Sequence, residues 1–394
     1  MPGRATPEFD VAVIGLGALG SAAAYQAAIK GSKVVGFEQF ELGHVRGASH
    51  DTSRIVRTSY GPPEYVALAR SAYKDWAELE RRTGQTLLTI TGGVVLLPRD
   101  SPHSVNDYAR SLDVNGVSYE LLTPTEVNRR WPQFNISDNV DTVYTADSGI
   151  VHASRSVVAM QYLARAHGAV LKERTEVTRL MPRDDGGVVV ETSDGRFFVS
   201  KVILATDAWA NKLLEPLNAT VPLSVMQEQV TYFKPDDATL FEPSRFPVWI
   251  WGEKEWYYGF PSYGEPTIKA GRDVSNNFMA PEQRTYVHSP ELLEQLSTFV
   301  GNLIPTKGQA LRTITCQYAI TPDRQFILSP LKQHQDIILG LGAGHGFKFA
   351  PAIGRVLAEL AMEEKQVRIY QSLGSPRRRA AGECREAAVP GCCV

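Results

Sequence analysis

Residues 9–38 read FDVAVIGLGALGSAAAYQAAIKGSKVVGFE. The apolar run from Val11 to Ile14 predicts a buried strand that ends in the glycine-rich turn 15–20. An alanine-rich stretch to Lys30 predicts a helix, and the segment from Lys33 to Glu38 predicts a second buried strand. A strand, a glycine turn, a helix and a second strand within about 30 residues are typical of the dinucleotide-binding βαβ unit.

The glycines of this turn have separate roles in such a unit. One allows the tight turn, the next lets the backbone approach a pyrophosphate, and the third lets the helix pack on its strand. The N-terminus of the helix then directs its amide dipoles at the phosphates. Glu38 can accept hydrogen bonds from both ribose hydroxyls and would repel a 2′-phosphate, which argues against NADP. The alternative is a glycine turn that serves packing alone, but the flanking strands, the helix and Glu38 favour a nucleotide site.

Length and composition describe an ordinary globular protein. A chain of 394 residues is long enough for two interlocked domains. A net charge of −2 gives no electrostatic reason to expect nucleic acid or an anionic membrane as a partner. No apolar run reaches the roughly 18–20 residues that span a bilayer, and residues 1–10 lack the apolar core of a signal peptide.

The cysteines indicate a reducing compartment. Cys316 stands alone in the part expected to fold, while Cys384, Cys392 and Cys393 lie close to the C-terminus. Four cysteines in this length do not make a disulfide framework. We therefore expect a cytoplasmic protein. As a separate expectation, we take it to be a monomer. For a eukaryotic source a peroxisomal location stays open, although the C-terminus carries no signal for it.

The order of the remaining elements predicts the domain plan. Helices are expected at 65–82, 105–112, 156–167, 289–303 and 351–364, strands at 87–97, 177–180, 187–192, 201–206 and 336–341, and strand-rich chain at 221–269. Rossmann-like segments at both ends of the chain predict an α/β fold with a discontinuous nucleotide domain and an inserted substrate domain, whose sheet is mixed or antiparallel. We assign 1–88, 150–217 and 316–370 to the first, 89–149 and 218–315 to the second, and 371–394 to a disordered tail.

Five blocks in the same order carry a resemblance to a known family. They are Gly15 to Gly20, Gly47 to Arg57, Tyr258 through Lys269, Cys316 to Asp323 (CQYAITPD) and Gly344 to Phe349 (GHGFKF). With them the chain resembles the monomeric sarcosine oxidase and N-methyltryptophan oxidase family of FAD-dependent amine oxidoreductases, over nearly all of its length to about Met362. Pipecolate oxidases and fructosyl amino-acid oxidases are relatives of that family.

The resemblance implies FAD as the cofactor, with no metal. It implies a covalent bond between the 8α-methyl carbon of the flavin and Cys316, which would otherwise be taken for an ordinary buried core cysteine. His50 and Arg54 match residues beside the flavin ring, where a cation stabilises the reduced, anionic ring. The implied cofactor-binding residues are Gly15, Gly17, Ala18, Leu19, Gly20, Glu38, Gln39, Ser49, His50, Ser53, Arg54, Val177, Trp209, Cys316, Gly344, Gly346, Phe347 and Lys348.

The resemblance also implies the substrate and oxygen sites. Arg57 and Lys348 match the pair that holds the substrate carboxylate, a task suited to a guanidinium with an ammonium beside it. Tyr258 and Tyr318 match residues that line the substrate pocket, although ordinary core tyrosines are an alternative. Lys269 matches the lysine that promotes reaction with O2, because a fixed ammonium stabilises the charge that develops on dioxygen. Otherwise it would be a strand-edge charge. Lys269, Arg54 and His50 are therefore the expected catalytic residues.

Three positions depart from the family pattern. Asp273 stands where the amine oxidases carry a histidine, and as a substrate-binding residue it would favour a cationic or hydroxylated substrate. Asp207 stands where the family usually has glycine. Pro62 replaces an acidic residue that follows Gly61 in sarcosine oxidases, which weakens the case for sarcosine itself.

The expected reaction is oxidation of an N-methyl or cyclic amino acid to an imine, with hydride transfer to flavin N5, hydrolysis of the imine, and reduction of O2 to H2O2. No strong general base is evident, and His345 is taken as a turn residue. Three alternatives stay open: a fructosyl amino-acid oxidase, a dehydrogenase that passes electrons to a protein acceptor, and a catalytically silent FAD-binding module.

Overall fold

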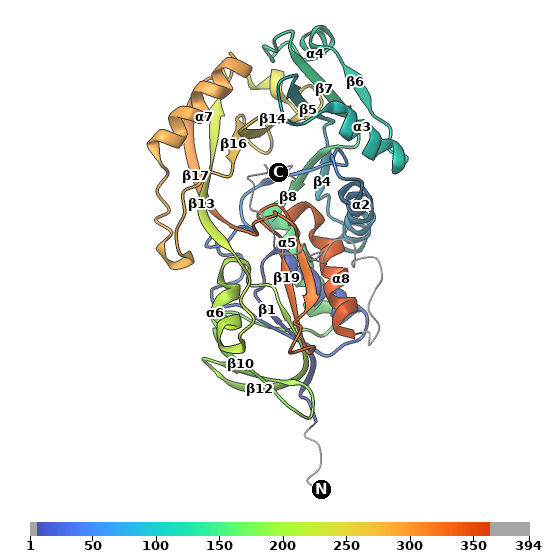
Figure 1. Ribbon diagram of the computed structural model, residues 1–394, viewed down its shortest axis with the longest axis vertical. Coiled ribbons are helices and arrows are strands. Elements are labelled where there is room, and N and C mark those ends of the chain that lie inside the picture. Colours follow the sequence, from blue (N-terminus) through green and yellow to red (C-terminus); the bar gives the residue numbers. More distant parts are fainter. Residues whose placement is uncertain (1–5, 363–394) are drawn as a thin grey trace, which may run out of the picture.

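A computed structural model describes residues 6–362, in which two large sheets lie end to end (Figure 1). The tail expected to be disordered, 371–394, lies outside the described residues, as do the three cysteines within it. None of the described helices is both long and apolar enough to cross a membrane.

The first sheet is built on the βαβ unit that the sequence predicts. β1 (Phe9–Ile14) pairs in parallel with β2 (Val34–Phe37) on one side and with β12 (Gly195–Leu204) on the other. β9 (Val170–Lys172) and β19 (Ile337–Leu341) extend the parallel part. Antiparallel strands complete the sheet: β10 (Val177–Pro182), β11 (Val188–Thr192) and β18 (Ile327–Pro330). Strands from both ends of the chain therefore share one sheet.

Helices α1 (Ala18–Ile29), α5 (Ala153–Ala166) and α8 (Ala350–Met362) pack beside this sheet. The nine buried residues of α1 are small apart from Tyr25, which lets its neighbours approach closely. A Cβ at Gly354 of α8 would lie 2.3 Å from the Cβ of Ala22, so glycine is required at that crossing. The contact fixes the helix that begins at the glycine turn.

The second sheet is mixed and mainly antiparallel. Its strands, in spatial order, are β17 (Gln309–Ile320), β13 (Ser224–Lys234), β16 (Ile268–Asp273), β15 (Trp256–Phe260), β14 (Val248–Gly252), β5 (Gly93–Pro98), β7 (Val140–Thr145) and β6 (Glu120–Leu122). Only β14 and β5 pair in parallel. α3 (Val105–Val114), α4 (Pro124–Arg130) and α7 (Pro290–Leu303) lie in this half of the molecule (Figure 1). The expected α/β fold with a second mixed sheet is confirmed.

Smaller elements join the two halves. A three-stranded sheet contains β3 (Ser53–Val56), β8 (Gly149–His152) and β4 (Leu88–Ile90), and α2 (Pro63–Thr83) packs against α8. α6 (Ala210–Leu214) follows the 3-10 turn η1 (Asp207–Trp209), and a second such turn, η5 (Phe347–Phe349), leads into α8.

Most predicted elements are confirmed within a few residues, and two differ for local reasons. The expected strand 87–97 is interrupted before Gly93, because Gly92 has a φ of 69° that no strand residue adopts. The expected strand 201–206 starts earlier, at Gly195, directly after the turn 193–194. Cys316 lies in β17, which pairs with β13 along its length in the second sheet, whereas we had grouped 316–370 with the nucleotide domain. The domain boundaries themselves stay a prediction.

Candidate active site

A cavity of about 320 Å³ lies between the two sheets. From the first sheet it is lined by residues at the carboxyl ends of β1, β2 and β12, and from the second by Tyr258, Phe260 and Tyr318. Ligands of open α/β sheets bind at this end of the parallel strands. The predicted site residues that line it are Gly15, Gly17, Ala18, Leu19, Glu38, Gln39, Ser49, His50, Arg54, Val177, Trp209, Tyr258, Tyr318, Gly344, Gly346, Phe347 and Lys348. Gly20, Ser53, Arg57, Lys269, Asp273 and Cys316 are not part of its wall.

The glycine turn has no room for side chains. Gly15 has a φ of 86°, and a Cβ there would lie 2.6 Å from the carbonyl oxygen of Ala205. A Cβ at Gly20 would lie 1.8 Å from the carbonyl oxygen of Gly15. The Ala18 amide at the start of α1 donates to Ser49 Oγ at 2.9 Å. The turn thus presents bare backbone and a helix N-terminus to the cavity, which fits a pyrophosphate.

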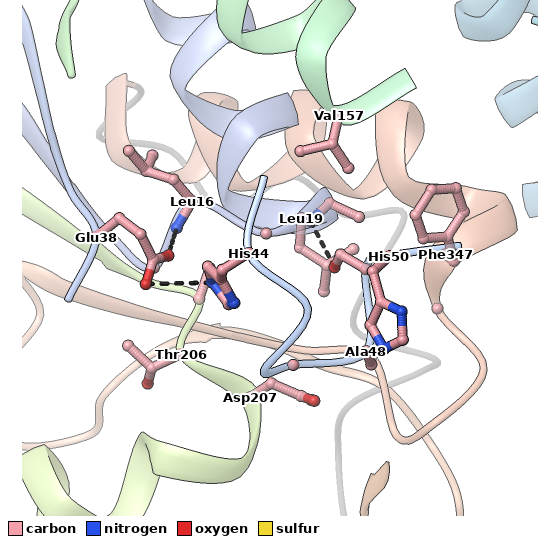
Figure 2. Close-up of a pocket in the computed structure, with 18 of the residues that line it drawn as sticks. Leu16, Leu19, Glu38, His44, Ala48, His50, Val157, Thr206, Asp207 and Phe347 are labelled. Carbon is pink, nitrogen blue, oxygen red and sulfur yellow. Dashed lines mark hydrogen bonds and ion pairs between the residues drawn. The ribbon is translucent and has the colours of Figure 1, made fainter. Parts of the chain in front are cut away.

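Glu38 follows β2 directly, is buried, and lies beside the glycine turn (Figure 2). Its Oε2 accepts the Leu16 amide at 2.9 Å and its Oε1 accepts the Phe40 amide at 3.2 Å. His44 Nε2 lies 3.4 Å from Oε1, and the Arg46 amide donates to His44 Nδ1 at 3.0 Å. The Nδ1 of His44 is therefore a hydrogen-bond acceptor and carries no proton. In a neutral ring the proton is then on Nε2, which faces Glu38. His44 is not recognisable as a site residue from the sequence, because only the fold brings it to Glu38.

Residues 43–50, here called the cover segment, lie along one side of the cavity. Arg284, buried to 7% exposure, holds this segment to β17. Its Nη1 donates to the carbonyl oxygens of Val45 at 2.7 Å and Arg46 at 2.8 Å, and its Nη2 donates to the carbonyl oxygen of Thr315. Arg284 is not recognisable as a site residue from the sequence, because nothing in its neighbourhood along the chain indicates a role.

His50 and Arg54 lie at the end of the cover segment and in β3. His50 Nε2 is buried without a hydrogen-bond partner among the described residues, although the residue lines the cavity. Burial, followed by the charges of Arg54 and Arg284, lowers the pKa of His50 to about 3, so its imidazole is neutral. Arg54 donates to the carbonyl oxygens of Ser53 and Ala48, each at 2.9 Å. A neutral ring with an unused nitrogen and a fixed cation fit a polar, electron-accepting ring in the cavity.

The inner face of the second sheet brings together side chains from four strands. Lys269 is opposite Phe260 on β15 and Tyr232 on β13, and Cys316 is opposite Glu228 on β13. Lys269 Nζ lies 4.3 Å from the Phe260 ring centroid and donates to the Ser53 carbonyl oxygen at 2.8 Å and to Asp51 Oδ2 at 3.0 Å. Lys269 is therefore a buried, oriented cation behind the cavity wall.

Cys316 is 7% exposed and adjacent in sequence to Gln317, with Tyr318 next on the same face of the strand. Burial raises the pKa of the Cys316 thiol to about 11, and the nearby Arg54 and Arg284 guanidinium groups act in the opposite direction. The effect of burial is the larger one, so the thiol form of Cys316 is favoured at neutral pH.

Arg57 and Lys348 are both buried, at 3% and 7% exposure. The Arg57 guanidinium lies 4.1 Å from the Tyr60 ring centroid, and the Lys348 carbonyl oxygen accepts from Trp76 Nε1 at 2.9 Å. Burial, followed by the charge of Arg57, holds the pKa of Lys348 well below its ordinary value. An anion bound beside these two side chains would offset the burial and the charge of Arg57, both of which disfavour the protonated form of Lys348.

Asp273 is engaged by a partner that the sequence did not reveal. Arg324 Nη1 donates to Asp273 Oδ2 at 2.7 Å, and the Asp273 side chain is 1% exposed. The backbone carbonyl of Arg324 contacts His345 Nε2 at 2.9 Å. This hydrogen bond gives His345 a structural role in its turn. Asp273 is thus half of a buried ion pair.

The other two departures also have definite places. Asp207 lies on the cavity wall with a φ of 47°, a backbone conformation that favours glycine and that Asp and Asn tolerate. Burial raises the pKa of its carboxyl group to about 7. Pro62 caps the start of α2, and Pro63 takes the first helical position, where a missing amide costs nothing.

Comparison with known proteins identifies the family of this chain. Residues 10–360 match the family described as FAD dependent oxidoreductase, DAO. The chain is 35% identical to the monomeric sarcosine oxidase of Streptomyces avermitilis, over 95% of this chain and 99% of that one. It is 31% identical to the N-methyl-L-tryptophan oxidase of Salmonella arizonae, over 91% of this chain and 95% of that protein. Its structure resembles that of NikD, an unusual amino acid oxidase essential for nikkomycin biosynthesis, with a TM-score of 0.81 and 27% sequence identity. The match covers 94% of this chain and 98% of the NikD chain. The chain therefore belongs to the family of FAD-dependent oxidoreductases, in its group of sarcosine and N-methyltryptophan oxidases, and it is an FAD-dependent amine oxidase.

Proposed function

We propose that this enzyme converts a secondary-amine amino acid, N-methyl or cyclic, into an imine that water hydrolyses. When bound, FAD supplies the redox chemistry: it takes hydride from the carbon beside the nitrogen and delivers the electrons to O2 as H2O2. The observation that supports the proposal is the burial of two basic side chains close to one another, Arg57 and Lys348, with Lys348 on the wall of a cavity whose other end fits a dinucleotide. In addition, we propose that it acts as a monomer, as its relatives named monomeric sarcosine oxidase do.

Arg57 and Lys348 would hold the substrate carboxylate. A guanidinium binds a carboxylate through two parallel hydrogen bonds, which fixes an amino acid in one orientation. A bound carboxylate would also raise the pKa of Lys348, since it offsets the burial and the charge of Arg57 that lower it. This electrostatic gain is available to an acid and is lost to an ester or an amide.

FAD would lie with its pyrophosphate at the glycine turn and its ribose at Glu38. The neutral imidazole of His50 and the cation of Arg54 would lie beside the ring system. We propose that Cys316 tethers the cofactor covalently. The position of Cys316 supports this, because it lies on β17 two residues before Tyr318, which lines the cavity from the same face of the strand.

Lys269 would promote the reaction with O2. Dioxygen acquires negative charge as it is reduced, and a preorganised ammonium in a dry site stabilises that charge. Lys269 is 3% exposed and held by two hydrogen bonds, so it would need no rearrangement during the reaction.

The fructosyl amino-acid alternative depended on Asp273 as an unoccupied carboxylate. Arg324 already engages this carboxylate, so Asp273 offers a substrate amine no free negative charge. Among the described residues, Asp273 was the feature that favoured a fructosyl substrate, and it is already paired with Arg324.

The experiment is an aerobic H2O2 screen of N-methyl amino acids, cyclic imino acids and fructosyl amino acids. We expect H2O2 from one of the first two classes, and no turnover of the corresponding methyl ester or amide. An ester that is oxidised as well as its acid would contradict the roles of Arg57 and Lys348. Turnover of fructosyl substrates alone would refute the proposed substrate class.

A further inference from the structure

Asp51 lies between the cover segment and β3, in a backbone conformation that is unusual for its type. Its φ is 82°, a region that glycine occupies readily and other residues rarely. The carbonyl oxygen of Asp51 accepts from both the amide and the hydroxyl of Ser154 on α5, at 3.1 and 3.0 Å. The surrounding structure therefore holds the strained residue in place, which is typical of functional sites.

The Asp51 side chain is buried and fully engaged. Tyr232 Oη donates to its Oδ1 at 2.6 Å, and the Thr52 amide donates to the same oxygen at 2.7 Å. Its Oδ2 accepts from Lys269 Nζ at 3.0 Å. The two side chains are 6% and 3% exposed, so this is a buried ion pair. A buried pair of this kind is unfavourable unless further hydrogen bonds complete it, and here Tyr232, Thr52 and Ser53 do so.

Among the charged groups that face Lys269, Asp51 is the carboxylate that stabilises the ammonium. Arg54 on β3 is a second cation, and its Nη1 lies 3.9 Å from Asp51 Oδ2. The Cys316 thiol on β17 and the Tyr232 and Phe260 rings complete the surroundings. Burial is the main cause that lowers the pKa of Lys269, to about 8, and Asp51 opposes it while Arg54 adds to it.

We propose that Asp51 is the positioning residue of the oxygen site: its carboxylate keeps Lys269 protonated and aims the ammonium. The proposal rests on the oxygen-activating role of Lys269 that belongs to the proposed function. Without the carboxylate, Lys269 would lie beside Arg54 in a dry site and lose its proton at a lower pH. Reoxidation by O2 would then fail at a lower pH, while reduction by substrate would continue.

The test compares Asp51→Asn with the wild-type holoenzyme. Asparagine keeps the size of the side chain and tolerates a positive φ, but it carries no charge. We expect the midpoint of the pH-dependent loss of flavin reoxidation to shift down by about one pH unit or more, so that reoxidation slows at least about fivefold at pH 8 and about tenfold at pH 9. Anaerobic reduction by substrate should change less than twofold. Asp51→Gly, which suits a φ of 82°, repeats the test if Asp51→Asn does not fold.

A second measurement does not depend on turnover. With lysine labelled with 13C at the ε carbon, the Lys269 resonance is identified by its loss in Lys269→Met, and its titration midpoint is followed by NMR. The midpoint should be lower in Asp51→Asn and in Asp51→Gly than in wild type. Asp75→Asn, which removes a carboxylate from the Arg355 ion pair between α2 and α8, is the matched control and should shift neither measurement.

The outcomes separate this inference from the proposed function. If Lys269→Met slows reoxidation but Asp51→Asn shifts neither profile, the assignment of Asp51 is wrong and the role of Lys269 stands. If Lys269→Met reoxidises as fast as wild type, the oxygen role of Lys269 falls, and the role of Asp51 falls with it.

Discussion

Replacing Arg284 with methionine tests whether the cover segment is held closed by one buried guanidinium. Arg284 donates to the carbonyl oxygens of Val45, Arg46 and Thr315, and methionine fills the space without any donor. A hydrogen bond from a charged donor contributes ~1.5–3 kcal/mol, and two of these bonds reach the cover segment. Because the freed carbonyls of an opened segment regain water, we take the loss of closure as about 2–4 kcal/mol.

Each 1.4 kcal/mol changes a dissociation constant tenfold, so this loss would raise the Kd for FAD by about 30- to 700-fold. The assay titrates flavin-free protein with FAD in a Cys316→Ala background, in which exchange is reversible, and follows flavin fluorescence. Arg99→Ala, which removes an exposed pair with Asp141, is the control and should leave the affinity unchanged. An Arg284→Met protein that folds and binds FAD within twofold of its background would refute the closure argument.

Three further predictions concern the cofactor bond, the substrate and the pH dependence of stability. Acid-precipitated wild-type protein should stay yellow and Cys316→Ala should release its flavin, whereas a colourless wild-type precipitate would rule out the covalent bond. Arg57→Ala and Lys348→Ala should each raise KM by the equivalent of about 2–5 kcal/mol, measured in steady-state kinetics, because a buried charged partner is removed; an unchanged KM would contradict carboxylate capture. Burial raises the pKa of Asp207 to about 7, so the folded protein retains a proton that the unfolded chain releases near pH 4, and stability falls as the pH rises through this window. The free energy of unfolding of Asp207→Asn should therefore increase relative to that of wild type by about 2–3 kcal/mol as the pH is raised from 5 to 8. The measurement is urea unfolding of the flavin-free protein, and a difference that does not change with pH would show that Asp207 stays ionised.

The sequence predicts best what depends on neighbours along the chain. The βαβ unit is visible because the strand, turn, helix and strand of residues 9–38 follow one another, and each glycine has a steric reason that the structure shows. The helix 289–303 is equally local, since Ser289 caps it and Pro290 begins it. The cavity residues from five distant blocks were placed together by resemblance to a family, which periodicity alone does not provide.

The contacts that the sequence did not reveal join residues far apart in the chain. The partner of Lys269 is Asp51, and the partner of Asp273 is Arg324. Two of the carbonyls that Arg284 binds, those of Val45 and Arg46, lie more than 200 residues away along the chain. Such pairs depend on strand register and on loops that cross between sheets, so a single sequence gives no sign of them. Asp273 illustrates the consequence: it forms an ion pair with Arg324 that the sequence does not indicate, and its predicted role in substrate binding stays a prediction.

The central claim is tested most directly by mixing the oxidised enzyme anaerobically with secondary-amine amino acids and then admitting O2. We expect that at least one N-methyl or cyclic amino acid bleaches the flavin absorbance without oxygen, and that the colour returns on aeration with one H2O2 for each substrate oxidised. Lys269→Met should bleach nearly as fast as wild type but recover its colour far more slowly. If no secondary-amine amino acid bleaches the flavin, in protein that has bound FAD, the enzyme is not an oxidase of this substrate class.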